Sequence, residues 1–293
     1  MSIVDKIYCF HQGAGDNGEL WYNVFDGSSW MGDAKVPNTG MSAGPSVTVY
    51  NKKIYCFHQG AEDNGELWYN VFDGSKWAGD VRVPNTGMSA GPSVTVYNKK
   101  IYCFHQGAED NGELWYNVFD GSSWMGDAKV PNTGISAGPS ATVYNDKIYC
   151  FHQGAENNGE LWYNVFDGSK WAGDVRVPNT GMSAGPSATV WYYGDYNHVG
   201  IYCFHQGAGD NGELWYNAFD GSKWAGDVRV PNTGMSAGPS ATVFGSIGII
   251  CFHQGAGDNG ELWYNVFNGS TWAGDAKVPN TGMSVGPTAI EPF

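Results

Sequence analysis

The sequence predicts an all-β protein: a single six-bladed β-propeller domain that fills residues 1–293. Three observations support this prediction. One unit returns six times, each unit divides into four short strands, and an extra strand at the end of the chain matches a strand that is missing at its start. A repeat of 40–50 residues that holds four strands is typical of a propeller blade.

The repeat is clearest in the segment FHQGAGDNGELWYNVFDG at residues 10–27, which returns five more times with few changes. The first three steps from copy to copy are 47 residues long, and the next two are 53 and 48. We therefore expect six structural units of about 47 residues each. The copies begin at Phe10, Phe57, Phe104, Phe151, Phe204 and Phe252.

The fourth unit shows the four predicted antiparallel strands in order. Residues 139–143 (PSATV) have small side chains, which suit the crowded inner strand. Residues 147–153 (KIYCFHQ) and 160–166 (ELWYNVF) are rich in the β-branched and aromatic residues that strands favour. The outer strand is expected at residues 171–178. Turn residues such as Asn-Asp-Lys and Asp-Gly-Ser-Lys separate these segments, so each unit reads as an up-and-down sheet.

The two ends of the sequence predict a closed ring. The first unit begins at its second strand, because residues 1–5 are too few for an inner strand and a turn. Residues 287–292 read as an inner strand with no second strand after it. Pairing of this C-terminal strand with the N-terminal strands closes the ring and removes the free sheet edges. The rival architecture, a linear β-solenoid, has no need of such a strand.

Composition excludes several classes of function. The net charge is −14 and the isoelectric point about 4.7, which argues against nucleic acid and anionic membrane surfaces as partners. The sequence has no apolar run of about 18 residues, and MSIVDKIYCF lacks signal-peptide features. We therefore expect no membrane insertion, and a cytoplasmic or non-classically secreted protein. Each unit holds one cysteine at the same place, which predicts small buried residues rather than disulfides.

Differences between the units are unevenly distributed. The turn between the first and second strands varies most and includes an insertion at residues 192–200, which could be a dimer contact or a local decoration. The segments HQGA and VPNTG, on the opposite face of the predicted disc, hardly change. This asymmetry favours ligand binding on the face of the second-to-third and fourth-to-first loops. Recent duplication is the alternative explanation for the similarity.

A polar and aromatic cluster recurs on that face. Amides and carboxylates pair with adjacent sugar hydroxyls, an aromatic ring packs on the apolar face of a pyranose, and repetition strengthens weak sites. The predicted carbohydrate-binding residues are His11, Asn17, Glu19, Trp21, His58, Asn64, Glu66, Trp68, His105, Asn111, Glu113, Trp115, His152, Asn158, Glu160, Trp162, His205, Asn211, Glu213, Trp215, His253, Asn259, Glu261 and Trp263.

Each residue type also has a purely structural interpretation. His11 could tie its strand to a neighbouring loop, Asn17 could serve only a turn with Gly18, and Glu19 could be a solvated charge. Trp21 suits the core as well as a ligand platform. Trp30 is expected to pack between blades, and Met41 to form an apolar contact at the loop.

Catalysis, metals and cofactors are not expected. Six identical shallow sites are a poor way to build one complement to a transition state. The segment Gly-Asp-Asn-Gly-Glu lacks the regular oxygen ligands of a calcium loop. A non-catalytic protein-interaction propeller remains an alternative, although such platforms usually diversify their blades. The sequence does not determine whether the protein forms an oligomer.

The repeat FHQGAGDNGELWYNVFDGSSW with VPNTGMS resembles the tandem-repeat propeller lectins of mushrooms, of the Agrocybe type, over essentially the whole chain. This resemblance implies binding of terminal N-acetylglucosamine on glycans and glycoproteins. The repeat is also similar to the fungal fucose-binding propeller lectins, in which an arginine grips the sugar. The matching position alternates here between lysine and arginine, which weakens the fucose interpretation: Lys35, Arg82, Lys129, Arg176, Arg229 and Lys277.

Overall fold

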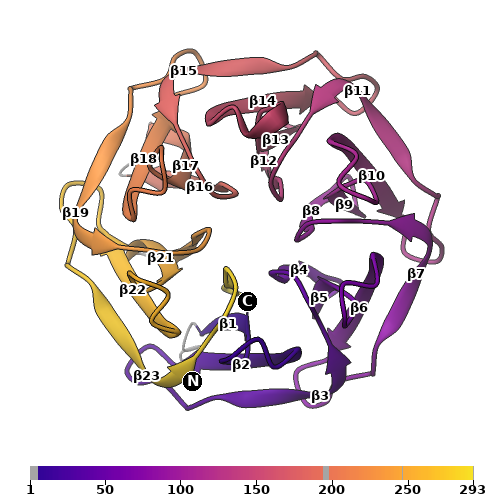
Figure 1. Cartoon of the computed structure of the whole chain (residues 1–293), viewed down its shortest axis with the longest axis horizontal. Coiled ribbons are helices and arrows are strands. Elements are labelled where there is room, and N and C mark those ends of the chain that lie inside the picture. Colours follow the sequence, from indigo (N-terminus) through magenta and orange to yellow (C-terminus); the bar gives the residue numbers. More distant parts are fainter. Residues whose placement is uncertain (1–5, 194–197, 246, 293) are drawn as a thin grey trace.

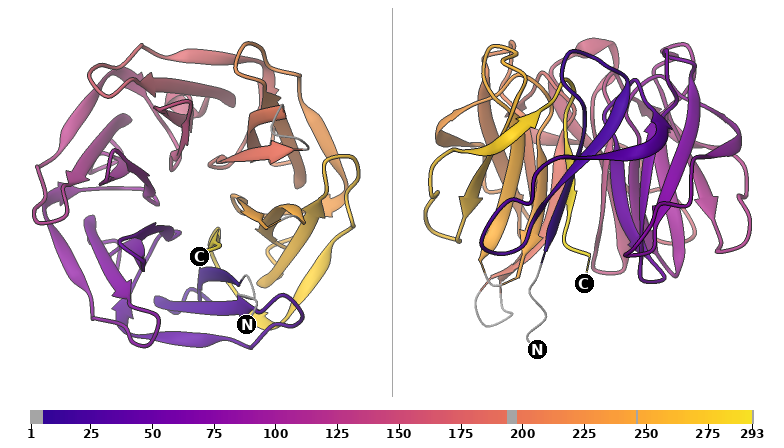
Figure 2. Two further views of the ribbon diagram at one scale, coloured as in Figure 1. Left: turned by 180° about the vertical axis from the view of Figure 1, so that it is seen from behind. Right: turned by 90° about the horizontal axis from the view of Figure 1, so that it is seen from below.

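The computed structural model describes residues 6–193, 198–245 and 247–292, which form a ring of six four-stranded antiparallel sheets (Figure 1). Each sheet is one blade, and blade 1 contains the strands nearest the N-terminus. The side view shows a disc whose strands run between two faces (Figure 2). The first-to-second and third-to-fourth turns lie on one face. The second-to-third and fourth-to-first loops lie on the other, which we call the loop face.

The four strand positions repeat in every blade. The innermost strands are β4 (Ser46–Tyr50), β8 (Ser93–Tyr97), β12 (Ser140–Tyr144), β16 (Ser187–Tyr193), β20 (Ser240–Phe244) and β24 (Thr288–Ile290). The second strands are β1 (Ile7–Gln12), β5 (Lys53–Gln59), β9 (Lys100–Gln106), β13 (Lys147–Gln153), β17 (His198–Gln206) and β21 (Gly248–Gln254).

The third strands are β2 (Glu19–Phe25), β6 (Glu66–Phe72), β10 (Glu113–Phe119), β14 (Glu160–Phe166), β18 (Glu213–Phe219) and β22 (Glu261–Phe267). The outermost strands are β3 (Ala34–Gly40), β7 (Val81–Gly87), β11 (Ala128–Gly134), β15 (Val175–Gly181), β19 (Val228–Gly234) and β23 (Ala276–Gly282). One short 3₁₀ helix, η1 (Ala155–Asn157), lies in a loop of blade 4.

Ring closure occurs as predicted. The sheet of blade 1 has the order β24-β1-β2-β3, with Tyr8 opposite Ile290 and Phe10 opposite Thr288. The inner strands are also linked from blade to blade. For example, the Ala289 N–H donates to Ser240 Oγ of blade 6 at 3.0 Å. The six-bladed ring therefore joins its two ends within one sheet.

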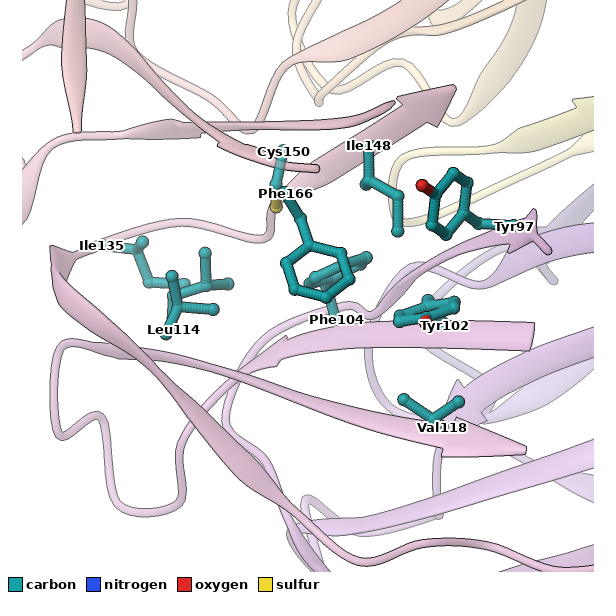
Figure 3. Close-up of a cluster of buried hydrophobic side chains, with 10 residues drawn as sticks. Tyr97, Tyr102, Phe104, Leu114, Val118, Ile135, Ile148, Cys150 and Phe166 are labelled. Carbon is teal, nitrogen blue, oxygen red and sulfur yellow. The ribbon is translucent and has the colours of Figure 1, made fainter. Parts of the chain in front are cut away.

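The core lies between neighbouring blades, as Figure 3 shows for blades 3 and 4. Phe104 and Leu114 of blade 3 pack there with Ile148, Cys150 and Phe166 of blade 4. Because side chains alternate along a strand, each blade buries one set against the preceding blade and the other against the next. The six cysteines are buried and free, as predicted.

One predicted boundary is wrong. The outer strand of the fourth unit was expected at residues 171–178, but β15 spans Val175–Gly181. Trp171 forms only an isolated bridge with Phe166, and Gly173 follows with a φ of 102°. The strand continues past Pro178 because β15 lies at the edge of its sheet, where a missing N–H breaks no ladder, and its register shifts there.

Candidate functional site

The third strand of each blade carries three polar or aromatic side chains on one face. In β2 these are Glu19, Trp21 and Asn23, which alternate along the strand and so project from the same side of blade 1. Asn23 Nδ2 donates to Thr281 Oγ1 of blade 6 at 2.8 Å. This side therefore faces the preceding blade, and Glu19 and Trp21 border the gap between the two blades.

A carboxylate whose side chain is 34% exposed is the centre of this arrangement. Glu19 Oε2 accepts hydrogen bonds from Trp21 Nε1 at 3.2 Å and from Asn17 Nδ2 at 3.4 Å. Its Oε1 forms an ion pair with Lys35 of the neighbouring strand β3. Asn17 Oδ1 in turn accepts the backbone N–H of Glu19 at 2.9 Å. We call these four residues, and their equivalents, the carboxylate cluster.

The same cluster recurs in all six blades. In each, the Trp Nε1 lies 3.2 or 3.3 Å from Glu Oε2, and a lysine or arginine pairs with Glu Oε1. The other five clusters are Asn64, Glu66, Trp68 and Arg82; Asn111, Glu113, Trp115 and Lys129; Asn158, Glu160, Trp162 and Arg176; Asn211, Glu213, Trp215 and Arg229; and Asn259, Glu261, Trp263 and Lys277.

The carboxylates are accessible, and each is paired with a cation. Their side chains are 29–35% exposed. The hydrogen bond from Lys35 is the main cause that lowers the pKa of Glu19, and Lys129 and Lys277 lower the pKa values of Glu113 and Glu261 in the same way. Each cluster therefore presents a carboxyl group, a cation and an indole N–H within one small area.

The predicted histidines lie elsewhere. His11 is fully buried, with Nδ1 3.1 Å from the carbonyl of Gln12 and Nε2 3.3 Å from Asp33 Oδ1. Asp33 Oδ1 also accepts a hydrogen bond from Thr281 Oγ1 of the preceding blade at 3.1 Å. The imidazole thus ties its strand to the neighbouring loop of Asp33, and Asp33 links it to the preceding blade. The equivalent histidines are also 0% exposed: His58, His105, His152, His205 and His253.

Two other side chains have structural positions. Trp30 packs on the preceding blade, with ring centroids 6.0 Å from Phe252 and 5.8 Å from Tyr264, as expected of an interblade residue. Met41 was expected to form an apolar contact at the loop. It is 1% exposed and belongs to the core cluster between blades 1 and 2.

A cavity opens on the loop face between blades 1 and 2, with a volume of about 520 Å³. Asp16 and Asn17 line one side, and Glu62 and Asp63 of blade 2 line the other. Asn17 belongs to both this cavity and the carboxylate cluster of blade 1. We call this space the interblade cavity. An equivalent cavity of about 650 Å³ lies between blades 3 and 4.

Gln12 also lines the interblade cavity and is 3% exposed. Its Nε2 donates to the carbonyl of Met41 at 3.2 Å, which fixes the orientation of the amide. Among the residues that the structure describes, Gln12 Oε1 has no hydrogen-bond partner.

The cation of each cluster was missing from the predicted set. Lys35 lies opposite Trp21 in the register of β2 and β3. It is on the outer strand, outside the repeated segment at residues 10–27 from which the site was predicted. In the sequence, the alternation of lysine and arginine at this position served only as an argument against fucose, and the cation was not placed beside Glu19.

Within the described ranges, no group of three or more His, Cys, Asp or Glu side chains is placed to hold a metal ion. Over the same residues, no helix has the length and apolar character needed to cross a membrane.

Comparison with known proteins gives similarity in structure only. No protein-family model and no curated protein sequence matches this chain. It is similar to the fucose-specific lectin from Aleuria aurantia, with a TM-score of 0.70 and 16% identity over 94% of this chain and 92% of that one. AofleA from Arthrobotrys oligospora gives a TM-score of 0.68 and 13% identity over 99% and 90%.

A third similar structure is the SapL1 lectin in complex with α-methyl fucoside, with a TM-score of 0.66 and 19% identity over 91% of each chain. At these identities the similarity shows the fold: a six-bladed β-propeller of the kind found in these lectins.

Proposed function

We propose that this chain is a multivalent carbohydrate-binding protein with one sugar site at the carboxylate cluster of each blade gap. The observation that carries the proposal is the sixfold repetition of an exposed carboxylate held between an indole N–H and a cation. A carboxylate accepts hydroxyl hydrogens and a cation donates to hydroxyl oxygens, so one cluster can bind two adjacent hydroxyls of a sugar. The buried histidines are left out of this site.

The half-buried tryptophan adds an apolar surface beside the charged pair. Each site is small and open, which is typical of weak binding to one sugar, with dissociation constants of about 1 μM to 1 mM. Six sites on one rigid disc raise the affinity for a densely glycosylated surface through multivalency. This arrangement supports adhesion to glycans rather than turnover of one substrate.

The sugar that we propose first is terminal N-acetylglucosamine, which the sequence resemblance implies. Fucose is the second candidate, because similar propellers are fucose-binding lectins and because an arginine pairs with the carboxylate in three blades. The charge of −14 disfavours anionic glycans as ligands for either candidate.

A glycan array with sugar-inhibited haemagglutination tests this proposal. We expect glycans ending in N-acetylglucosamine or fucose to bind and the free sugar to inhibit. Replacing all six cluster glutamates by glutamine should abolish both signals, because an amide no longer supplies a charged acceptor. Glu62→Gly, Glu109→Gly and Glu156→Gly together serve as the control: they alter the second-to-third loop on the same face and leave all six clusters intact. If no glycan binds at any density, the proposal is wrong.

A further inference from the structure

The six carboxylate clusters fall into two groups of three. Blades 1, 3 and 6 use a lysine, and blades 2, 4 and 5 use an arginine. The residue before the cation divides in the same way, with alanine before each lysine and valine before each arginine. The lysine clusters contain Lys35, Lys129 and Lys277, and the arginine clusters contain Arg82, Arg176 and Arg229.

The two groups also differ in the exposure of their side chains. The lysine side chains are 44–45% exposed and their glutamates 33–35%. The arginine side chains are 52–55% exposed and their glutamates 29–30%. The hydrogen bond from the tryptophan is the same in both groups, at 3.2 or 3.3 Å. The cation is therefore the part of the cluster that differs.

The chemistry of the two cations is not equivalent. Each arginine contacts its glutamate through Nη2 at 2.9 Å, and a guanidinium has five N–H donors in one plane. With more than half of the side chain exposed, donors remain that can bind two adjacent hydroxyl oxygens in a fixed orientation. A lysine ammonium is a compact charge with three donors, and its direct contact with the glutamate engages part of them.

Resting on the sugar-binding function proposed above, we infer that the six sites form two affinity classes, three tight arginine sites and three weak lysine sites. The cation is thus the residue that sets affinity for a neutral sugar with adjacent hydroxyls. The chain displays the two classes in the order weak, tight, weak, tight, tight, weak around the ring.

Calorimetry on three proteins tests this inference, with the methyl glycosides of N-acetylglucosamine and of fucose as probes. The first protein is the natural chain. The second carries Lys35→Arg, Lys129→Arg and Lys277→Arg, and the third carries Arg82→Lys, Arg176→Lys and Arg229→Lys. Both exchanges use residues that the chain itself has at equivalent positions, so unchanged melting temperatures are expected and serve as the folding control.

For the natural chain we expect two sets of three sites whose dissociation constants differ by about tenfold, the effect of one additional charge-assisted hydrogen bond. The all-arginine protein should show six sites of the tight class, and the all-lysine protein six of the weak class. If a probe binds and the three proteins give the same single class, the inference is wrong while sugar binding stands. If neither the probes nor any array glycan binds, both proposals are wrong.

Discussion

At the scale of the residue, the turns between the third and fourth strands allow a comparison of aspartate, in five blades, with asparagine, in blade 6. Asp26 Oδ1 accepts hydrogen bonds from the N–H and the hydroxyl of Ser28 and from the Ser29 N–H, at 2.8–2.9 Å. These bonds lower the pKa of Asp26 to about 2. Blade 6 has Asn268 at this position, whose Oδ1 accepts the equivalent N–H groups at 2.9–3.0 Å without a titrating group. The other turn aspartates with a pKa of about 2 are Asp73, Asp120, Asp167 and Asp220.

These five aspartates predict acid sensitivity. Because their pKa values are near 2 in the folded chain and near 4 in the unfolded chain, they stabilise the fold above about pH 4. This stabilisation is lost as the pH falls from about 4 through 2. Replacing all five by asparagine, as in blade 6, should preserve the turns. The melting temperature of this variant should fall less between pH 4 and pH 2 than that of the natural chain. An equal fall in melting temperature between pH 4 and pH 2 in the variant and the natural chain would contradict this account.

The loop before each cluster contains a second residue-scale comparison. Glu62, Glu109 and Glu156 have φ values of 59–60°, in the left-handed region, where the other three units have glycine. Glu62→Gly should therefore stabilise the fold, by about 0.5 kcal/mol, because the relieved strain exceeds the added flexibility of the unfolded chain. Urea denaturation measures this change. Gly15→Glu is the reverse variant, and a stabilising effect of that change would overturn the explanation.

At the scale of the element, neighbouring blades are joined by a buried polar network. His152 contacts Asp174 at 3.1 Å, and Asp174 accepts a hydrogen bond from Thr133 of the preceding blade at 3.3 Å. Asn164 also donates to Thr133, at 2.8 Å. The network therefore links second and third strands of one blade to the outer strand of the blade before it.

His152→Ala should destabilise the fold by about 3 kcal/mol, because it leaves a cavity and removes a partner of the Asp174 carboxylate, whose side chain is only 17% exposed. Chemical denaturation of the variant measures this loss. Lys170→Ser is the control, since blades 1 and 3 have serine at that turn position and no loss is expected. A loss below about 0.5 kcal/mol for His152→Ala would show that the network contributes little.

The strands show how far the sequence predicts this fold. The second and third strands match their predicted bounds in the fourth unit, because aromatic and β-branched residues fill them and turn residues bound them. The outer strand was misplaced because Pro178 reads as a strand end, although an edge strand tolerates it. The numbers of strands and blades were predictable from the repeat. Ring closure was predictable because the first unit starts at its second strand and the chain ends with an extra inner strand.

The candidate site was less predictable than the fold. Trp21 and His11 lie opposite each other on paired strands and so share one face of the blade. Their depth in the gap differs, since His11 lies one strand nearer the axis and is covered by the preceding blade. Alternation of side chains along a strand identifies the face of the blade on which a residue lies, but not how deep it lies in the gap between blades. The buried histidine and the exposed glutamate therefore looked equally suitable for contact with a ligand.

At the scale of the whole molecule, the ring depends on a short closing strand. β24 pairs with β1 through residues 288–290 and bonds to Ser240 of blade 6. Without it, blade 1 loses its inner strand and the inner edge of β1 becomes free.

Deleting residues 288–293 should lower the melting temperature by about 5–10 °C, since about three net hydrogen bonds of about 1 kcal/mol each are lost. Thr288→Ser is the control, because the other five inner strands begin with serine and no change is expected. Scanning calorimetry of both proteins measures the effect. Equal melting temperatures for the deletion and the full chain would mean that the ring does not need this strand.

The whole account places one neutral sugar at each carboxylate cluster. A crystal structure of the chain with the methyl glycoside that binds best tests this claim most directly. We predict sugar density in the blade gaps, with hydroxyls in hydrogen-bond contact with Glu19 and its equivalents and with the paired lysine or arginine. Sugar bound only in the interblade cavities, in the centre of the ring or on the face opposite the loop face would contradict it.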